Sequence, residues 1–272
     1  MTEHHTPPRV GIWMFPDAPA KHLLDAVISL DRAGVDECWI ADEAVSREPM
    51  VVFSAAAPQT THVKMAVGIT SPVLRHPGAM ASSIATLDEL SGGRAMLGFG
   101  VGGALSLDPF KLTAERPVAL IRDAIRTARA VIERRPSDLY EPPAHASPGR
   151  SVPIFVGSRG EQINKLASRE ADGVFLSSWA LDSLGTAVEW ARSARPIHVA
   201  LYPSIRFRAD AASDPTSLCG DPAAVAAGLV ELVERHRPES IGLALVDGDP
   251  IPRMVESALE AIRLYRAALT SR

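Results

Sequence analysis

Residues 91–103, SGGRAMLGFGVGG, place six glycines around one short apolar run. Such a stretch could cradle a phosphate, form turns, or clear a surface for a flat ligand. A dinucleotide-binding fingerprint needs a strand, then GxGxxG, and then a helix that starts on the last glycine. Here residues 91–93 are expected to end a helix, and Gly98, Gly100 and Gly102 alternate along the next strand. We interpret them as one bare strand face for a planar ring; barrel packing or a bulge is the alternative.

A second glycine-bearing turn, Gly157-Ser158-Arg159-Gly160, stands between a predicted strand and a predicted helix. Free backbone N–H groups and the positive end of a helix meet at such a turn. The hydroxyl of Ser158 and the guanidinium of Arg159 add donors suited to a phosphate. The turn is therefore a candidate phosphate site, although any strand-to-helix turn can be rich in glycine.

Two carboxyl groups, Asp42 and Glu43, are expected where the second strand ends. A carboxyl group in a partly apolar pocket can have its pKa raised toward neutrality, and it can then act as a proton donor or base. A solvated carboxylate or a helix cap is an equally good interpretation. We take Glu43 and Asp42 as the candidate catalytic residues.

Three aromatic residues also stand near predicted strand ends: Trp13 and Phe15 at the first strand and Trp179 at the sixth. Packing in a core is the usual role of such side chains. Because strand ends face the site of a barrel enzyme, we expect at least one of the three to line a substrate pocket.

Other chemistries find little support in the sequence. Among eight histidines, His76 is expected at a helix start, and His198 lies in a strand whose facing the sequence leaves open. The first strand, GIWMF, lacks the HxH pattern of barrel metal hydrolases, so no metal site is expected. There is no GxSxG elbow, and Cys38 and Cys219 form no CxxC pattern.

The elements that must position these residues alternate along the whole chain. Strands are predicted at residues 10–15, 36–42, 63–70, 94–101, 152–157, 172–178, 196–202 and 240–246. Helical patterns such as 20–34, 77–93, 222–239 and 255–269 lie between them. Eight strand–helix units predict a parallel (β/α)8 TIM barrel over residues 9–272, with a doubly wound open sheet as the alternative. Residues 1–8 are expected to be a disordered tail, and the proline-rich 134–149 a loop.

Composition limits the partners. The chain has 272 residues, is 46% hydrophobic, and carries a formal net charge of -4 without a basic stripe, which argues against nucleic acid. No apolar run reaches the roughly 20 residues of a membrane helix. The polar start MTEHHTPP has no signal-peptide core, so a cytoplasmic protein is expected.

Residues 64–103, KMAVGITSPVLRHPGAMASSIATLDELSGGRAMLGFGVGG, resemble the core signature of the bacterial luciferase-like superfamily. This superfamily comprises flavin-dependent monooxygenases and oxidoreductases that depend on the deazaflavin coenzyme F420. Weaker matches are 39–42, 48–49, 115–116 and 152–178, so the resemblance spans residues 10 to about 180. The LDELSGGR and GxGxG portion is its specific part.

The resemblance implies a barrel whose cofactor lies across the carboxyl ends of the strands. It also implies a non-proline cis peptide at Gly68–Ile69, where a bulge would press on the ring and help to hold it bent. Many relatives carry histidine where Glu43 stands. Relatives that oxidise sugar phosphates have a glutamate at the position of Gly103-Ala104, so that activity is disfavoured. The implied cofactor-binding residues are Gly68, Ile69, Thr70, Gly100, Val101, Gly102, Gly157, Ser158, Arg159, Gly160, Ser177 and Ser178.

The predicted function is hydride transfer between coenzyme F420 and an organic substrate, with reduction of an activated C=C or C=N bond. The substrate is a small molecule or a modified peptide, contacted by loops 104–115, 134–150 and 203–220, and the protein is expected to be a homodimer. An FMN-dependent monooxygenase is the alternative, disfavoured by Glu43-Ala44 and by a short chain with little room for lids. A non-catalytic flavin-binding or interaction barrel is the third possibility.

Overall fold

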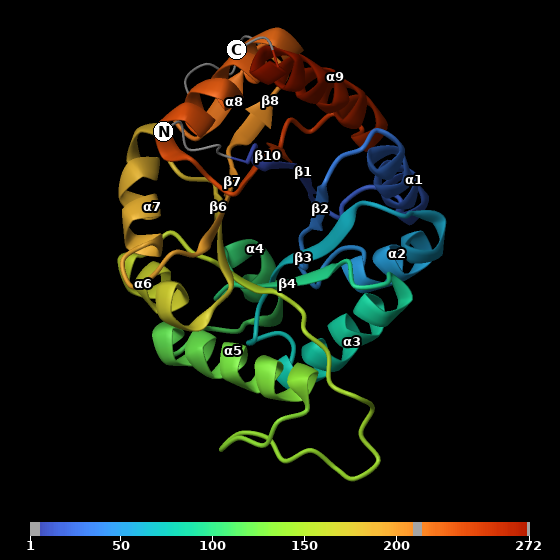
Figure 1. Ribbon diagram of the computed structural model, residues 1–272, viewed down its shortest axis with the longest axis vertical. Helices are drawn as coiled ribbons and strands as arrows, with labels where there is room; N and C mark the ends of the chain where they lie inside the picture. The colour runs from blue at the N-terminus through green and yellow to red at the C-terminus, as the bar shows by residue number, and fades with distance from the viewer. Residues whose placement is uncertain (1–5, 209–213, 271–272) are drawn as a thin grey trace.

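Parallel strands form a closed barrel in the computed structural model, which describes residues 6–208 and 214–270. The strands of the barrel are β1 (Arg9–Met14), β2 (Glu37–Ile40), β3 (Lys64–Thr70), β4 (Ala95–Phe99), β5 (Ile154–Gly157), β6 (Gly173–Ser177), β7 (His198–Tyr202) and β10 (Ser240–Leu245). They pair in chain order, and β10 pairs with β1 to close the ring. The predicted (β/α)8 barrel is confirmed, and Figure 1 shows the strands as an inner ring inside the helices. Of the expected tail, residues 1–5 lie outside the described residues.

Helices follow the strands and form the outer layer. They are α1 (Ala20–Arg32), α2 (Pro49–Ala56), α3 (Pro77–Leu90), α4 (Ala104–Leu107), α5 (Pro117–Glu133), α6 (Glu161–Glu170), α7 (Leu184–Ala191), α8 (Pro222–His236) and α9 (Ile251–Thr270). Helix α3 shows how the sequence sets its limits: Pro77 occupies the first turn, and His76 caps it by accepting from the Gly78 N–H at 3.2 Å. Gly92 and Gly93, with φ of 68° and 89°, end it in the left-handed region. His76 is thus structural, as predicted.

Two short strands were missed from the sequence. β8 (Ser204–Arg206) pairs with β10 and β9 (Ser217–Cys219) pairs with β8, both in parallel. Pro203 separates β7 from β8 and has no N–H to donate, while its carbonyl accepts from the Ala244 N–H at 3.0 Å. β8 continues along β10 in the register of β7, so Pro203 interrupts one line of pairing. Three-residue segments are too short to show a period of two.

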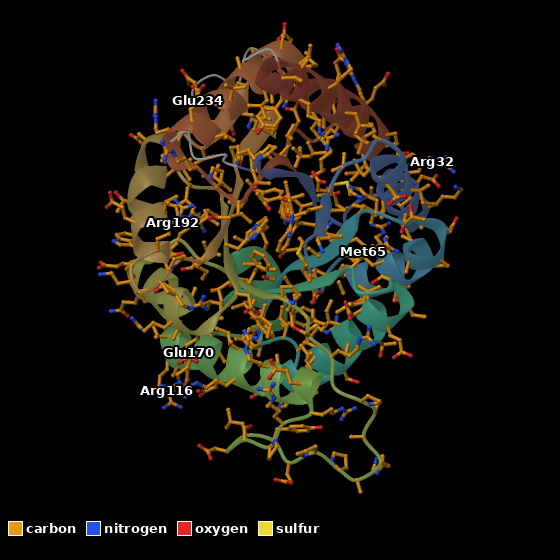
Figure 2. The ribbon with its side chains drawn as sticks, in the orientation of Figure 1. Arg32, Met65, Arg116, Glu170, Arg192 and Glu234 are labelled. Carbon is orange, nitrogen blue, oxygen red and sulfur yellow. The ribbon has the colours of Figure 1, made fainter. Side chains whose placement is uncertain are left out.

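The core has two layers. One cluster of apolar side chains, including Met65 of β3, fills the space between the strands and the helices, whereas Arg32, Glu170 and Arg192 lie at the periphery (Figure 2). A second cluster fills the interior of the barrel. Its members are Trp13, Trp39, Ala41, Ala66, Met96, Phe155, Phe175, Ala200, Tyr202 and Ala244. Large aromatic and small residues from different strands alternate there, so the barrel is a packed core.

Glycines in the strands make room for the interior rings. A Cβ at Gly11 would lie 1.9 Å from the Tyr202 hydroxyl oxygen, and one at Gly242 would lie 2.0 Å from the same ring. A Cβ at Gly68 would lie 2.1 Å from the Trp39 ring. These glycines are required by close packing against an aromatic neighbour.

A buried carboxylate, Glu37, forms hydrogen bonds with aromatic side chains of the barrel interior. Glu37 is the first residue of β2 and has 0% exposure. It accepts hydrogen bonds from Trp39 Nε1 (3.1 Å), the Tyr202 hydroxyl (3.0 Å) and the Ser240 hydroxyl (2.8 Å). Arg9 Nη1 lies 3.5 Å from the same carboxylate. Because every contact is a donor, the site is matched to a carboxylate that accepts at both oxygens.

We expect Glu37→Gln to lower the free energy of unfolding by about 1–3 kcal/mol, because the amide N–H₂ would face buried donors and leave polar groups unpaired. Urea unfolding followed by tryptophan fluorescence measures the change. The control is Glu260→Gln on α9, where the carboxylate is exposed and, among the described residues, pairs only with Arg263, so that a change within about 0.5 kcal/mol is expected. Equal effects of the two substitutions would contradict this role of Glu37.

Candidate functional site

A cavity of about 540 Å³ opens at the carboxyl ends of the barrel strands. Its walls come from the ends of β1 to β6 and of β10 and from helix α4, which follows β4. The volume lies in the range typical of small-molecule and cofactor sites, about 300–1,000 Å³. This is also the end of the barrel at which enzymes with this fold hold their active sites.

Most of the site residues predicted from the sequence line this cavity. They are Trp13, Phe15, Asp42, Glu43, Gly68, Ile69, Thr70, Val101, Gly102, Gly157, Ser158, Arg159, Ser177 and Ser178. Gly100, Gly160 and Trp179 do not line it. The expectation for Trp179 needs correction: its Nε1 donates to the Ser158 carbonyl at 3.1 Å, and its ring lies 6.1 Å from that of Trp190. Trp179 therefore lies outside the cavity and holds the 157–160 turn through its hydrogen bond to the Ser158 carbonyl.

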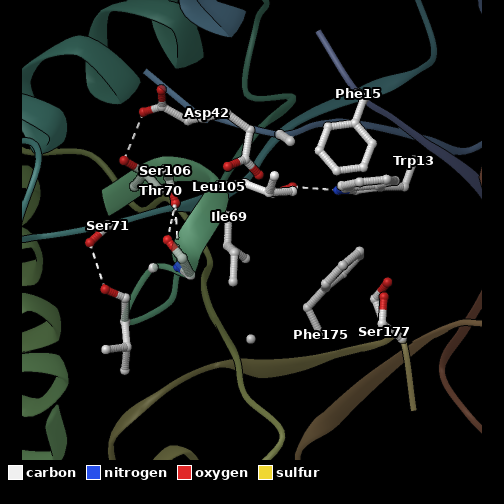
Figure 3. A pocket seen from close by; sticks show the side chains of 18 of the residues that line it. Trp13, Phe15, Asp42, Ile69, Thr70, Ser71, Leu105, Ser106, Phe175 and Ser177 are labelled. Atoms are coloured by element: carbon white, nitrogen blue, oxygen red, sulfur yellow. Dashed lines mark hydrogen bonds between the residues drawn. The ribbon is translucent and has the colours of Figure 1, made fainter. Parts of the chain in front are cut away.

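The floor of the cavity is the irregular end of β3. The peptide bond Gly68–Ile69 is cis, as the resemblance implies, and the pairing with β4 shifts register between Val67 and Thr70. The Trp13 indole N–H donates to the Gly68 carbonyl at 2.5 Å, and the Trp39 ring packs beneath Gly68. The Ile69 side chain is half-buried, lines the cavity and lies against Gly98, Gly100 and Gly157 (Figure 3).

The glycine face of β4 serves a different purpose from the one predicted. The strand ends at Phe99, so Gly100 and Gly102 lie beyond it. A Cβ at Gly98 would be 2.9 Å from Ile69 Cγ2, and one at Gly100 would be 2.1 Å from Ile69 Cδ1. The bare face is therefore filled by the side chain of Ile69, and a ligand would meet Ile69 in place of the glycines.

The 157–160 turn, which was predicted to bind a phosphate, connects β5 to helix α6. Gly160 is the residue before helix α6, and its N–H donates to the Ser158 hydroxyl at 3.0 Å. Arg159 is exposed, and within residues 6–208 and 214–270 no hydrogen bond or ion pair engages its guanidinium. Ser178, on the neighbouring strand end, has φ of 56°. The turn thus places the unpaired guanidinium of Arg159 and the first turn of the ten-residue helix α6 at the cavity.

The two carboxyl groups of the cavity differ in their partners. Asp42 is 5% exposed and accepts from the Thr70 hydroxyl at 2.8 Å, with Arg75 Nη1 at 3.4 Å. Glu43 forms no ion pair with any described residue. Burial raises the pKa of Glu43; an interaction with the Ser106 hydroxyl lowers that pKa in part, and the charge of Asp42 raises it. The raised pKa makes Glu43 the carboxyl group of the cavity better suited to donate a proton.

Several lining residues were missed from the sequence. They are Ala41, Ser71, Gly103, Phe175 and Val246, whereas Ala104, Leu105 and Ser106, which also line the cavity, fall within the 104–115 loop that was predicted to contact substrate. Helix α4 has only four residues, which is too few to show a helical period. Phe175 lies inside β6, and the alternation of the strand could have placed it on the interior face once the facing of Ser177 was assumed.

Other predicted regions lie away from the cavity. Residues 134–150 connect α5 to β5 at the opposite end of the barrel, and Figure 1 shows this segment extending away from the ring. The expectation that they contact substrate is wrong, because loops that follow helices emerge at the amino ends of the strands. The described part of 203–220 contributes no lining residue. His198 also stands at the amino end, where its Nε2 hydrogen-bonds the Ser240 hydroxyl at 2.7 Å.

Among the described residues, no group of three or more His, Cys, Asp or Glu side chains could hold a metal ion. None of the helices described in residues 6–208 and 214–270 has the length and apolar character that a membrane span requires.

Comparisons with known proteins agree with this architecture. The family model described as luciferase-like monooxygenase matches residues 2–197. A 5,10-methylenetetrahydromethanopterin reductase of Methanopyrus kandleri is 30% identical over 279 residues, covering 88% of this chain and 79% of that protein. An F420-dependent glucose-6-phosphate dehydrogenase of Kineococcus radiotolerans is 30% identical over 181 residues, covering 59% of this chain and 53% of that protein. The solved structure of the coenzyme F420-dependent tetrahydromethanopterin reductase from Methanopyrus kandleri superposes with a TM-score of 0.78 at 22% identity, covering 96% of this chain and 100% of that chain.

Proposed function

Because this chain belongs to the luciferase-like monooxygenase family, we propose that it is an oxidoreductase that transfers a hydride between coenzyme F420 and an organic substrate. The bond reduced is an activated C=C or C=N bond. The observation that carries the proposal is one cavity that unites the Gly68–Ile69 floor, the 157–160 turn and the unpaired carboxyl group of Glu43.

The residues present fit a deazaflavin. Ile69 offers an apolar surface for a planar ring in the middle of the cavity. Arg159 and the N–H groups at the start of α6 would hold the phosphate, since the guanidinium has no other partner among the described residues. Ser177 and Ser178 line the same side of the cavity and add hydroxyl groups.

A reduced deazaflavin supplies the hydride when it is bound, and the protein must supply one proton for each double bond that is reduced. Glu43 holds that proton, because burial and the neighbouring Asp42 favour its protonated form. Thr70 and Arg75 hold Asp42 in place, so Asp42 acts on the reaction through Glu43. Trp13, Phe15 and Phe175 keep water from one side of the cavity.

The family resemblance also supports finer proposals. We propose that the protein acts in the cytoplasm as a homodimer, and that residues 9–272 work as one catalytic unit. The substrate is a small molecule or a modified peptide. An FMN-dependent monooxygenase is the second candidate, favoured by the family description, since FMN shares the tricyclic ring and the phosphate that these residues would hold.

Parallel titrations with F420 and FMN, in oxidised and reduced forms, test the proposal. We expect F420 to bind more tightly than FMN, and we expect Arg159→Met to weaken F420 binding about 10- to 100-fold, the worth of a hydrogen bond to a charged group. Arg169→Met, in the last turn of the same helix, is the matched control and should bind F420 as the unchanged protein does. Tighter binding of FMN would make monooxygenation the working function, and binding of neither cofactor would leave the non-catalytic barrel.

A further inference from the structure

The part of the cavity beyond the cofactor-binding residues has two unlike walls. One wall is aromatic and apolar, formed by Trp13, Phe15 and Val246 at the ends of β1 and β10. The facing wall carries carboxyl groups, from Asp42 and Glu43 after β2, with helix α4 beside them. In Figure 3 Trp13 and Phe15 lie on one side of Ile69, and Asp42 and Ser106 lie on the other.

The side chains of the aromatic wall offer no free hydrogen-bond donor. The Trp13 and Phe15 rings pack edge to face, with centroids 4.6 Å apart and planes at 76°. The Trp13 N–H is already used by the Gly68 carbonyl at 2.5 Å. A substrate can therefore meet only ring faces and edges on this side, which favours a flat apolar group. Leu105, which lines the cavity and is 69% exposed, extends the apolar surface at the mouth.

The charges of the cavity disfavour an anionic substrate. Arg159 is the only Arg, Lys or His side chain among the described lining residues, and the cofactor phosphate would take it. Arg75 lies outside the lining and is engaged by Glu48 at 2.6 Å and Asp42 at 3.4 Å. The remaining ionisable groups of the described lining are the carboxyls of Asp42 and Glu43, so no cationic side chain is left to pair with a phosphate or a carboxylate, whereas a bound cation would favour the ionised form of Glu43.

We propose that the substrate is a flat aromatic or heteroaromatic molecule that is neutral or positively charged near the reacting bond, and that the site rejects phosphorylated and carboxylated substrates. This proposal rests on the proposed function, because it assigns Arg159 and the 157–160 turn to the cofactor. The proposed substrate differs from glucose 6-phosphate, after which the relative from Kineococcus radiotolerans is named.

Calorimetric titration with three similar bicyclic probes tests the proposal: quinoline, N-methylquinolinium and quinoline-3-carboxylate, with glucose 6-phosphate as a fourth. Each is added to protein loaded with oxidised F420, whose occupancy is read from its visible absorbance, and to the free protein. In the loaded protein we expect N-methylquinolinium to bind at least about tenfold more tightly than the carboxylate, equivalent to about 1.4 kcal/mol. Glucose 6-phosphate should show no binding.

Substitutions in the two walls show which side chains produce the preference for the cation over the carboxylate. A bound cation favours the ionised form of Glu43, which Gln cannot adopt, so Glu43→Gln should reduce the preference for the cation over the carboxylate to about twofold or less. Trp13→Leu should weaken all three quinolines alike. Glu141→Gln, an exposed carboxylate in the 134–150 segment at the opposite end of the barrel, is the control and should leave every affinity unchanged.

Equal binding of the carboxylate and the cation, measurable binding of glucose 6-phosphate to the loaded protein, or an unchanged preference in Glu43→Gln would overturn the proposal. Failure of the proposed function gives a different result. In that case F420 does not load, yet the free protein still reports whether the Trp13 and Glu43 walls prefer the cation.

Discussion

Replacing Glu43 with Gln should lower the rate of reduction of a neutral activated alkene by about 10²- to 10⁴-fold, the usual worth of a general acid. Glutamine keeps the shape of the side chain but has no proton to give to the substrate. Benzylideneacetone, a flat neutral enone, is a suitable probe, and oxidation of reduced F420 in single turnovers gives the rate. The affinity for F420 should stay within about twofold, since Glu43 is assigned to the proton and not to cofactor binding.

The matched control is a substrate that needs no proton. N-methyl-3,4-dihydroisoquinolinium becomes a neutral amine on accepting a hydride alone, so Glu43→Gln should slow its reduction by less than about tenfold. An equal loss with both probes would show that Glu43 positions the substrate or cofactor and does not transfer a proton.

The pH dependence of the same reaction gives a second check on Glu43. Burial raises the pKa of Glu43 above its ordinary value of 4.5, and the proton-donating form exists below that raised pKa. The rate with benzylideneacetone should therefore fall as the pH rises through it. Ser106→Ala removes an interaction that lowers the pKa, so the fall should move to higher pH. In Glu43→Gln the fall should be absent; its persistence would assign it to another group.

Gly100→Ala should weaken F420 binding about 10- to 100-fold, because overpacking of a filled site costs about 1–3 kcal/mol. The new Cβ would lie 2.1 Å from Ile69 Cδ1 and 3.3 Å from the Gly157 carbonyl oxygen. The backbone cannot give way easily on either side, so the Ile69 side chain must turn into the cavity where the ring would lie. Fluorescence titration with F420 measures the loss.

Two further variants separate this steric effect from general damage. Ile69→Val removes Cδ1, so the double variant Gly100→Ala/Ile69→Val should recover most of the affinity, a non-additive result expected of residues in contact. Gly185→Ala on α7 is the glycine control, because Gly185 does not line the cavity and the nearest atom to a Cβ built there, His236 Cε1, lies 3.8 Å away. A double variant no better than Gly100→Ala alone would show that Ile69 does not mediate the loss.

The end of the barrel that holds the site was predictable from the sequence, because the order of strands and helices fixes the direction of the strands. Strands alternating with helices must be parallel, so their carboxyl ends meet at one end of the barrel. Residues at strand ends, such as Glu43 and Arg159, were therefore predicted to meet, and the family resemblance added Thr70; all three line one cavity. The helix limits were also readable, as His76-Pro77 and Gly92-Gly93 show at the two ends of α3.

The facing of individual side chains was not predictable, because it depends on contacts between residues distant in the chain. Trp179 turns toward Trp190, and no local pattern of residues predicts that direction. Helix α4, beside Glu43, has four residues, which are too few to show a helical period. The burial of Glu37 at 0% exposure depends on donors from β1, β7 and β10.

The sequence by itself determined the barrel and the end of the barrel at which the site lies, because the alternation of strands and helices can be read locally and parallel strands end together. The family resemblance named many of the residues at that end. Only the tertiary structure decided what fills the glycine face of β4. Alternating glycines indicate that the space beside the strand must be free of their own side chains, but they do not indicate which other atoms occupy that space. That volume holds Ile69, which reaches it from the neighbouring strand β3.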